Sequence, residues 1–224
     1  NAAWLTTATG IGSTLSPGDD GESDYQHIRN LLKEVKTTSY NQTNEFFDGS
    51  QGEGDADGNP STDNIIEKIN QGTGVVFYAG HGSPSSMATG SITKDVVENL
   101  SNNGKYPLIW SAACENGNFV DRYCIAEAWL RANKNGQPTG AIAALMSSGS
   151  QTSYPPMEAQ DKIAVLISNP SEELSTMGAI SNKGMMSMND AYGMAGYETT
   201  DTWILFGDPS LRVRTATPKE FIVD

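Results

Sequence analysis

The amino-acid sequence predicts an α/β fold built on a mostly parallel central sheet. Short apolar runs of strand length alternate along the chain with segments whose apolar residues recur at helical spacing. Strands that are joined through helices pair in parallel, because the crossover returns the chain to the end of the sheet where the preceding strand began. With 224 residues, of which 37% are apolar, the chain is long enough to bury a core of this kind.

The first third of the chain is expected to hold three strands and two helices. Asp24 stands at the start of the first helix, where it either caps the first turn or adds a favourable negative charge to it. Thr62 is placed to cap the second helix, which ends at Gly72. The expected strands are residues 4–11, 45–47 and 75–79, and the expected helices are residues 24–35 and 62–71.

The alternation continues through the rest of the chain. The expected helices are residues 93–100 and 120–133, and the expected strands are residues 106–111 and 141–146. Five methionines are spread irregularly over residues 177–194, a segment expected to pack as a helix or as a wall of the core.

Composition and charge limit the classes of partner. A net charge of −13 and a pI near 4.4 argue against nucleic acid or an anionic membrane surface, and favour the attraction of cationic ligands. The sequence holds no run of about 18 apolar residues, so no membrane span is expected. Its two cysteines do not form a disulfide framework. Because the first residue is Asn1 rather than Met, we expect a piece processed or excised from a longer precursor.

Two of the predicted strands run directly into reactive residues. His81 and Gly82 follow the apolar run at 75–79, and the run that begins at Leu108 leads into Cys114. In parallel α/β sheets the ligand site lies beyond the carboxyl ends of the strands, and neighbouring strands are about 4.8 Å apart. A thiol nucleophile and an imidazole base could therefore share one substrate, as in a cysteine hydrolase.

The same two turns could also supply an oxyanion hole, from the N–H groups of Gly82 and Cys114. The alternative is that Cys114 is a small buried apolar residue and His81 an ordinary turn residue. Their joint placement at two neighbouring strand ends favours a catalytic role for both residues over this alternative.

Several segments resemble the gingipain family of cysteine peptidases, the caspase-like proteases that Bacteroidetes secrete. The resemblance is carried by residues 81–83, 113–119 and 203–214, extends through nearly the whole chain, and is closest to the arginine-specific members. It implies a caspase-like three-layer α/β/α sandwich and a location outside the cell or at its surface. It also implies that residues 1–224 form one catalytic subdomain, the second of two, with a preceding subdomain of the same precursor as a partner.

The resemblance assigns roles to the two turns as well. It implies Cys114 as the nucleophile, His81 as the general base and acid, and Gly82 as an oxyanion-hole donor. An acid that orients the imidazole would complete such a site. Asp19, Asp20 and Glu22 are the candidates, with Glu22 favoured, although a Cys-His dyad can suffice.

A pocket for a basic substrate side chain is a further implication of the resemblance. Residues 21–27 are similar to the stretch that supplies the pocket aspartate in the arginine-specific members, and Asp24 stands at the matching position. A carboxylate there would pair with a guanidinium through two hydrogen bonds. The alternative is that Asp24 only caps its helix, although one side chain can serve both roles.

The expected pocket wall, residues 151–157, departs from the family. Gln151 and Met157 belong to the loop that lines the pocket in the arginine-specific members, but Ser153 stands where those members have a tryptophan. Either Tyr154 replaces the stacking ring or the pocket is wider, which leaves lysine or mixed basic specificity as an alternative to arginine. Met157 is also of the residue type that fills gaps in a core.

The insertion at residues 48–60 is acidic and rich in glycine. It and the helix start that follows offer oxygen ligands of the type that calcium prefers, from Asp55, Asp57, Asn59 and Asp63. The segment lacks the full twelve-residue calcium loop with its bidentate Glu, and a solvated acidic loop is the other interpretation. The chemistry itself requires no cofactor.

Together these features predict a cysteine endopeptidase that acts through a thioester acyl-enzyme. It is expected to cleave after basic residues, with arginine preferred over lysine. A sortase-like transpeptidase is an alternative, because it shares every step up to the acceptor. A noncatalytic caspase-like binding domain is another, against which the presence of both His81 and Cys114 counts.

Overall fold

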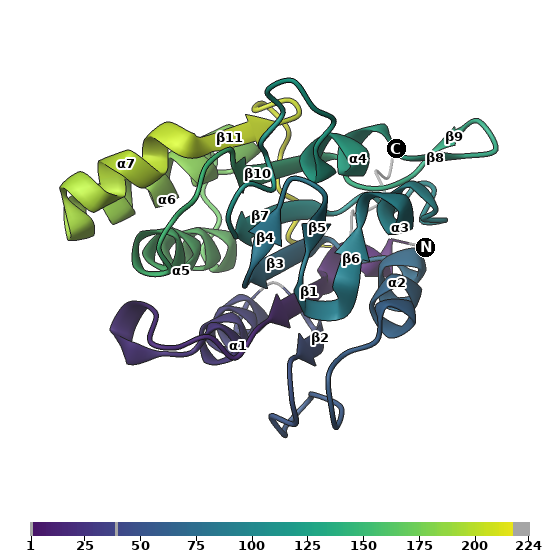
Figure 1. Ribbon diagram of the computed structural model, residues 1–224, viewed down its shortest axis with the longest axis horizontal. Helices are drawn as coiled ribbons and strands as arrows, with labels where there is room; N and C mark the ends of the chain where they lie inside the picture. Colours follow the sequence, from purple (N-terminus) through teal and green to yellow (C-terminus); the bar gives the residue numbers. More distant parts are fainter. Residues whose placement is uncertain (1, 39, 217–224) are drawn as a thin grey trace, which may run out of the picture.

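A six-stranded sheet runs through the middle of the protein (Figure 1). Its strands are β1 (Thr7–Gly12), β2 (Gln42–Phe47), β3 (Val75–Ala79), β7 (Leu108–Ala112), β10 (Ala143–Ser147) and β11 (Trp203–Phe206). The computed structural model describes residues 2–38 and 40–216. The strands lie in the order β11-β10-β7-β3-β1-β2, and all neighbours are parallel except β10 and β11. The predicted mostly parallel sheet is therefore confirmed.

Helices cover both faces of the sheet, which confirms the three-layer arrangement (Figure 1). One face is covered by α1 (Asp24–Lys36), α5 (Tyr154–Ser168) and α6 (Met177–Tyr192), and the other by α2 (Thr62–Gln71), α3 (Lys94–Glu98) and α4 (Ile125–Arg131). A last helix, α7 (Met194–Thr202), leads into β11. Within the described residues, every helix is too short or too polar to cross a bilayer.

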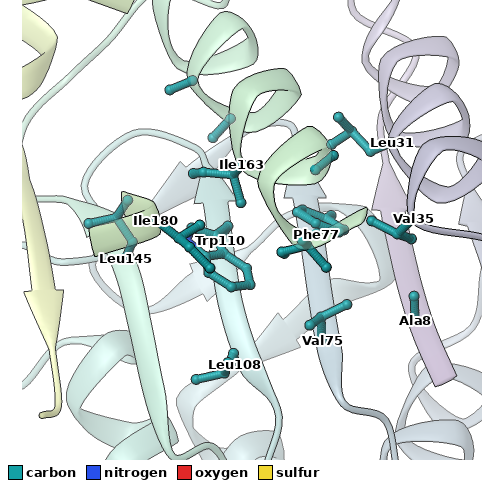
Figure 2. Packing of buried hydrophobic residues seen from close by; sticks show 14 of the residues in the cluster. Ala8, Leu31, Val35, Val75, Phe77, Leu108, Trp110, Leu145, Ile163 and Ile180 are labelled. Atoms are coloured by element: carbon teal, nitrogen blue, oxygen red, sulfur yellow. The ribbon is translucent and has the colours of Figure 1, made fainter. Parts of the chain in front are cut away.

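Alternate side chains of each strand enter the two cores that this arrangement creates. Val75 and Phe77 of β3 pack toward α1, α5 and α6, whereas Val76 and Tyr78 pack toward α2, α3 and α4. In the first core, shown in Figure 2, the rings of Phe77 and Trp110 stack with their centroids 5.8 Å apart. Because both of its faces are buried, β3 is a continuous apolar run rather than an alternating one.

Short elements occupy the connections. A three-stranded antiparallel sheet follows β3 and consists of β4 (Gly82–Ser83), β5 (Ser86–Met87) and β6 (Ile92–Thr93). A separate hairpin joins β8 (Asn133–Lys134) to β9 (Gln137–Pro138). The 3-10 helices are η1 (Ala3–Thr6), η2 (Asp19–Gly21) and η3 (Thr89–Ser91).

The structure corrects several predicted element ends. Residues 4–6 belong to η1 rather than to a strand, and the helix predicted at residues 120–133 extends only over Ile125–Arg131. Ser61, not Thr62, caps α2, because its Oγ accepts the N–H of Asn64 at 3.2 Å. The methionine-rich segment does form a helix, α6, as one of the two expectations had it.

Helix α5 was not predicted, because residues 151–157 were interpreted as a loop. Pro155 and Pro156 lie in its first turn, where a missing N–H breaks no hydrogen bond of the helix. The helix then continues to Ser168 and packs against α1 and α6. The predicted pocket wall therefore rests on a helix that is fixed on two sides.

Candidate active site

The carboxyl ends of β3 and β7 lie side by side and carry the two predicted catalytic side chains. Ala79 pairs with Ala112 at the last position of the ladder, and the Gly80 N–H still donates to the Ala112 carbonyl at 3.2 Å. His81 and Cys114 each follow two residues beyond these strand ends and line one cavity of about 180 Å³. The other predicted site residues that line this cavity are Asp24, Gln151, Ser153 and Met157.

Cys114 is a free, half-buried cysteine at the edge of the cavity. Its Sγ accepts the Gln151 N–H at 3.5 Å and lies 3.6 Å from the Gln151 carbonyl, to which the thiol can donate. The Gln151 N–H can bind the sulfur in either protonation state, whereas the contact with the carbonyl requires the thiol proton. Cys124, in contrast, is buried at the start of α4, where burial raises the pKa of its thiol. Of the two cysteines, Cys114 is the one placed for chemistry.

The backbone of His81 is held from two sides, while its ring is exposed at the cavity. The Tyr78 hydroxyl donates to the His81 carbonyl at 2.7 Å, and the Ala88 N–H donates to the same oxygen at 3.0 Å. Burial raises the pKa of Tyr78 to about 12, so its hydroxyl keeps its proton near neutral pH. The backbone at His81 is thus fixed, and its ring is open to a substrate in the cavity.

Gly82 lies in close contact with the turn that carries Cys114. A Cβ atom at this position would lie 2.5 Å from the Cys114 carbonyl oxygen and 2.7 Å from Nδ2 of Asn116. Distances this short exclude any side chain. Only glycine therefore allows the segment after His81 to approach the Cys114 turn as it does.

Asp24 is a buried carboxylate that faces the cavity. It does not cap α1, which corrects one of the two interpretations of this residue. Ser23 is the capping residue, and its N–H donates to Oε1 of Gln26 at 2.9 Å in a capping box. The Ser13 hydroxyl donates to Oδ2 of Asp24. Burial raises the pKa of Asp24, and the Ser13 hydrogen bond and the charges of His27 and His81 offset only part of this rise.

The wall opposite Asp24 is formed by the start of α5. Met157 is buried, and its sulfur accepts the Asp19 N–H at 3.4 Å, so the residue both fills space and lines the cavity. Tyr154 is 40% exposed and lies near Tyr192, with ring centroids 6.4 Å apart, rather than on the cavity. The suggestion that Tyr154 replaces the stacking ring is therefore not supported. Ser153 leaves that part of the wall open.

Gln151 contributes to the cavity in an unexpected way. Its backbone contacts Cys114, and its side-chain Oε1 accepts the indole N–H of Trp203 at 2.7 Å. Trp203 is the first residue of β11, so the antiparallel edge strand anchors the segment that contacts Cys114. The side-chain oxygen of Gln151 is thus hydrogen-bonded to Trp203.

Glu22 lies away from the cavity that holds His81. Its Oε2 is 3.7 Å from Nδ1 of His27, and its Oε1 accepts a hydrogen bond from Asn30 at 2.6 Å. The proximity of His27 and the hydrogen bond from Asn30 lower the pKa of Glu22. These contacts do not fit the predicted role of orienting His81. Asp19, another candidate, accepts a hydrogen bond from the Tyr192 hydroxyl instead.

The predicted calcium ligands do not converge. Asp55 accepts the N–H groups of Phe47 and Gln51 at 3.0 and 3.1 Å, and Asn59 accepts the N–H of Gly49 at 2.8 Å. These oxygens shape the loop, and Asp57 and Asp63 are exposed. Among the described residues, the acidic groups that gather within 4.8 Å of one another are instead Asp19, Glu158 and Asp161. As folded, the loop uses Asp55 and Asn59 to hold its own backbone.

The sequence predicts no role for three polar residues behind the site, Ser13, Gln160 and Asn116, although Asn116 lies within the segment 113–119. All three are buried and hydrogen-bonded. The signal that could have revealed Gln160 is its place among the apolar residues that α5 turns toward the core, such as Met157 and Ile163. A polar side chain on such a face needs partners inside the protein.

Comparison with known proteins agrees with this geometry. A profile of Peptidase family C25 matches residues 1–214. Gingipain R2 of Porphyromonas gingivalis is 36% identical over 228 residues, which cover 98% of this chain and 29% of that protein. Gingipain R1 of the same species is 35% identical, with 98% of this chain and 22% of that protein covered.

Solved structures agree as well. The crystal structure of the Arg-specific cysteine proteinase gingipain R matches with a TM-score of 0.89 at 33% identity, covering 98% of this chain and 50% of that one. The complex of the pro- and mature domains of the Porphyromonas gingivalis enzyme matches with a TM-score of 0.90 at 32% identity, covering 98% of this chain and 51% of that one. The chain therefore spans about half the length of these solved relatives.

Proposed function

The chain belongs to Peptidase family C25, and on this premise we propose that it is a cysteine endopeptidase that cleaves after basic residues. The observation that carries the proposal is the single cavity lined by Cys114, His81 and Asp24. A nucleophile, a base and a buried carboxylate around one hollow are the parts that such an enzyme needs. The gingipains R that match this chain support the same reading.

The proposed reaction runs through a covalent intermediate. His81 takes the thiol proton of Cys114 as Sγ attacks the carbonyl carbon of the scissile bond, and the imidazolium then gives this proton to the leaving amine. Water, deprotonated by His81, attacks the resulting thioester, and the proton returns to the Cys114 thiolate as the acid product leaves. The N–H groups of Gly82 and Cys114 would stabilise the oxyanion that forms at each attack.

Asp24 is the proposed determinant of specificity. Its buried carboxylate would pair with a cationic side chain that enters the cavity, and the net charge of −13 favours the approach of basic peptides. Arginine is the preferred residue in this proposal because the guanidinium can form two hydrogen bonds to a carboxylate. Lysine should be accepted as well, though less readily. The wall at Ser153 offers no ring on which a guanidinium could stack, so arginine lacks this further advantage over lysine.

We also propose that the protein acts outside the cell or at its surface, together with a preceding subdomain. The proposal rests on the family and on the match of this chain to half of a longer solved proteinase chain. Since calcium is abundant outside cells, a structural calcium ion is compatible with that location, although the loop at residues 48–60 would have to rearrange to bind it.

Fluorogenic peptides with Arg, Lys, Asp or Ala before the scissile bond test the function. The protein should cleave the Arg peptide fastest, then the Lys peptide, and Cys114→Ala should cleave neither. An affinity label with a basic side chain should modify Cys114 and block cleavage. The proposal fails if no peptide is cleaved and the label leaves Cys114 unmodified.

A further inference from the structure

Asn116 is a fully buried amide that joins the two loops of the site. The Ser111 hydroxyl donates to Oδ1 of Asn116 at 3.1 Å, which fixes the orientation of the amide. Its Nδ2 then donates to the carbonyls of Ser83 and Ser86, at 2.9 and 3.0 Å. Both N–H bonds of the amide are therefore used on a single target.

That target is the hairpin that begins at Gly82. The hairpin pairs β4 with β5, with Gly82 opposite Met87 and Ser83 opposite Ser86. Both carbonyls that Asn116 binds lie on this hairpin, one residue and four residues after Gly82. Gly82 itself approaches Nδ2 of Asn116 so closely that a Cβ atom would lie 2.7 Å from it. The side chain of Asn116 thus sets the distance between the hairpin and the turn that carries Cys114.

The other side of Asn116 is fixed to the main body of the protein. Its carbonyl accepts the Ala126 N–H of α4 at 3.1 Å, and the next residue, Gly117, donates to the Ser147 carbonyl of β10 at 2.7 Å. Glu115, which precedes it, has a φ of +58° and donates to the Gly149 carbonyl at 3.0 Å. The amide therefore projects toward the hairpin from a turn whose backbone is hydrogen-bonded to α4, to β10 and to Gly149.

We infer that Asn116 is a positioning residue that holds the Gly82 N–H in register with the Cys114 N–H, so that the two can bind one oxyanion. The inference rests on the proposed function. Oxyanion stabilisation depends on donors that are placed before the reaction, and a displacement of about 1 Å can cost about 100-fold in rate. The three hydrogen bonds of the side chain leave little room for such a displacement.

The test compares reactions of Cys114 that do and do not form an oxyanion. In Asn116→Ala, kcat for an Arg peptide should fall by about 10- to 100-fold with little change in KM, because Asp24 is untouched. Inhibition by a peptide aldehyde with a terminal Arg residue, which forms a tetrahedral adduct with the thiol, should weaken by a similar factor. Alkylation of Cys114 by iodoacetamide should stay within about twofold of wild type, since displacement of iodide creates no oxyanion.

A matched control separates positioning from loss of stability. Asn102 is also a buried amide, bonded to the Lys105 and Gly140 carbonyls at 2.9 and 2.8 Å, but it precedes β7 and lies at the amino end of the sheet. Asn102→Ala should lower the unfolding temperature and leave kcat unchanged. Asn116→Leu, which keeps the volume of the side chain but loses both donors, should reproduce the kcat loss and serves if the alanine variant does not fold.

An unchanged kcat in both Asn116 variants would overturn the inference, and so would an equal loss in peptide cleavage and in iodoacetamide alkylation. Either result would leave the peptidase proposal standing. Failure of the wild-type protein to cleave any peptide and to bind the aldehyde would overturn the proposed function itself.

Discussion

Nε2 of His27 and Oε1 of Gln160 lie 3.0 Å apart, and both side chains are fully buried. The amide N–H groups of Gln160 donate to the carbonyls of Tyr78 and Trp110, at 3.0 Å each. Oε1 must therefore face His27 as an acceptor, so Nε2 of His27 carries a proton. Through these contacts α5 connects α1, which bears Asp24, to β3 and β7, the strands that lead to His81 and Cys114.

Loss of the Gln160 amide should destabilise the fold. Gln160→Met keeps the length of the side chain but leaves two strand carbonyls and the His27 N–H without partners. We expect the free energy of unfolding, measured in urea, to fall by about 3 kcal/mol. The exposed Gln137→Met should change it by less than about 0.5 kcal/mol. Equal stabilities of the two variants would contradict the importance of the network.

Removal of the pocket charge should abolish the preference for basic residues. In Asp24→Asn, kcat/KM for the Arg peptide should fall by about 10- to 100-fold, because a charged hydrogen-bonding partner is lost. The rate of iodoacetamide alkylation at Cys114 should not change. Asp95→Asn, an exposed substitution in α3, is the charge control and should cleave like wild type. An Arg preference that survives Asp24→Asn would refute the pocket assignment.

Asp161 should make stability depend on pH. Burial raises its pKa from 3.8 to about 6, the charges of Glu22, Asp19 and Glu158 add to this rise, and His27 opposes it. A carboxyl with a raised pKa stabilises the folded state in its protonated form, below about pH 4, and this contribution is lost as the pH rises through about 6.

Asp161→Asn should consequently become more stable relative to wild type as the pH rises from 4 to 7. Urea unfolding at four pH values across this range measures the difference, with the exposed Asp201→Asn as the control for charge. A difference that stays constant across the range would show that Asp161 does not titrate in the expected window.

Asp55 should stabilise its loop without a metal. Asp55→Ala leaves the N–H groups of Phe47 and Gln51 without their acceptor and should lower the free energy of unfolding by about 1 kcal/mol. The loss should be the same in calcium and in a chelator, and the exposed Asp57→Ala should show almost none. If calcium raises the unfolding temperature of wild type but not of Asp55→Ala, the loop is a calcium site after all.

Much of the fold could be read from local patterns. The strand at residues 75–79 and the helix that begins at Asp24 have the predicted bounds or nearly so, because apolar spacing reports directly which faces are buried. The placement of His81 and Cys114 also followed from pattern, since parallel strands bring their carboxyl ends to one edge. Helix α5 could not be predicted this way. Two adjacent prolines are typical of a loop as well as of the first turn of a helix, and the sequence pattern does not distinguish the two.

The sequence alone determines which residues could be catalytic and at the ends of which strands they lie, because both follow from residue type and spacing. Which acid faces the cavity, and which amides hold its parts together, depends on contacts between segments far apart. Gln160 and Tyr78 are 82 positions apart, and Asn116 and Ser83 are 33. Glu22 and Asp24 differ by two positions, yet only Asp24 lines the cavity, because successive side chains of a helix entrance point in different directions and packing selects one of them.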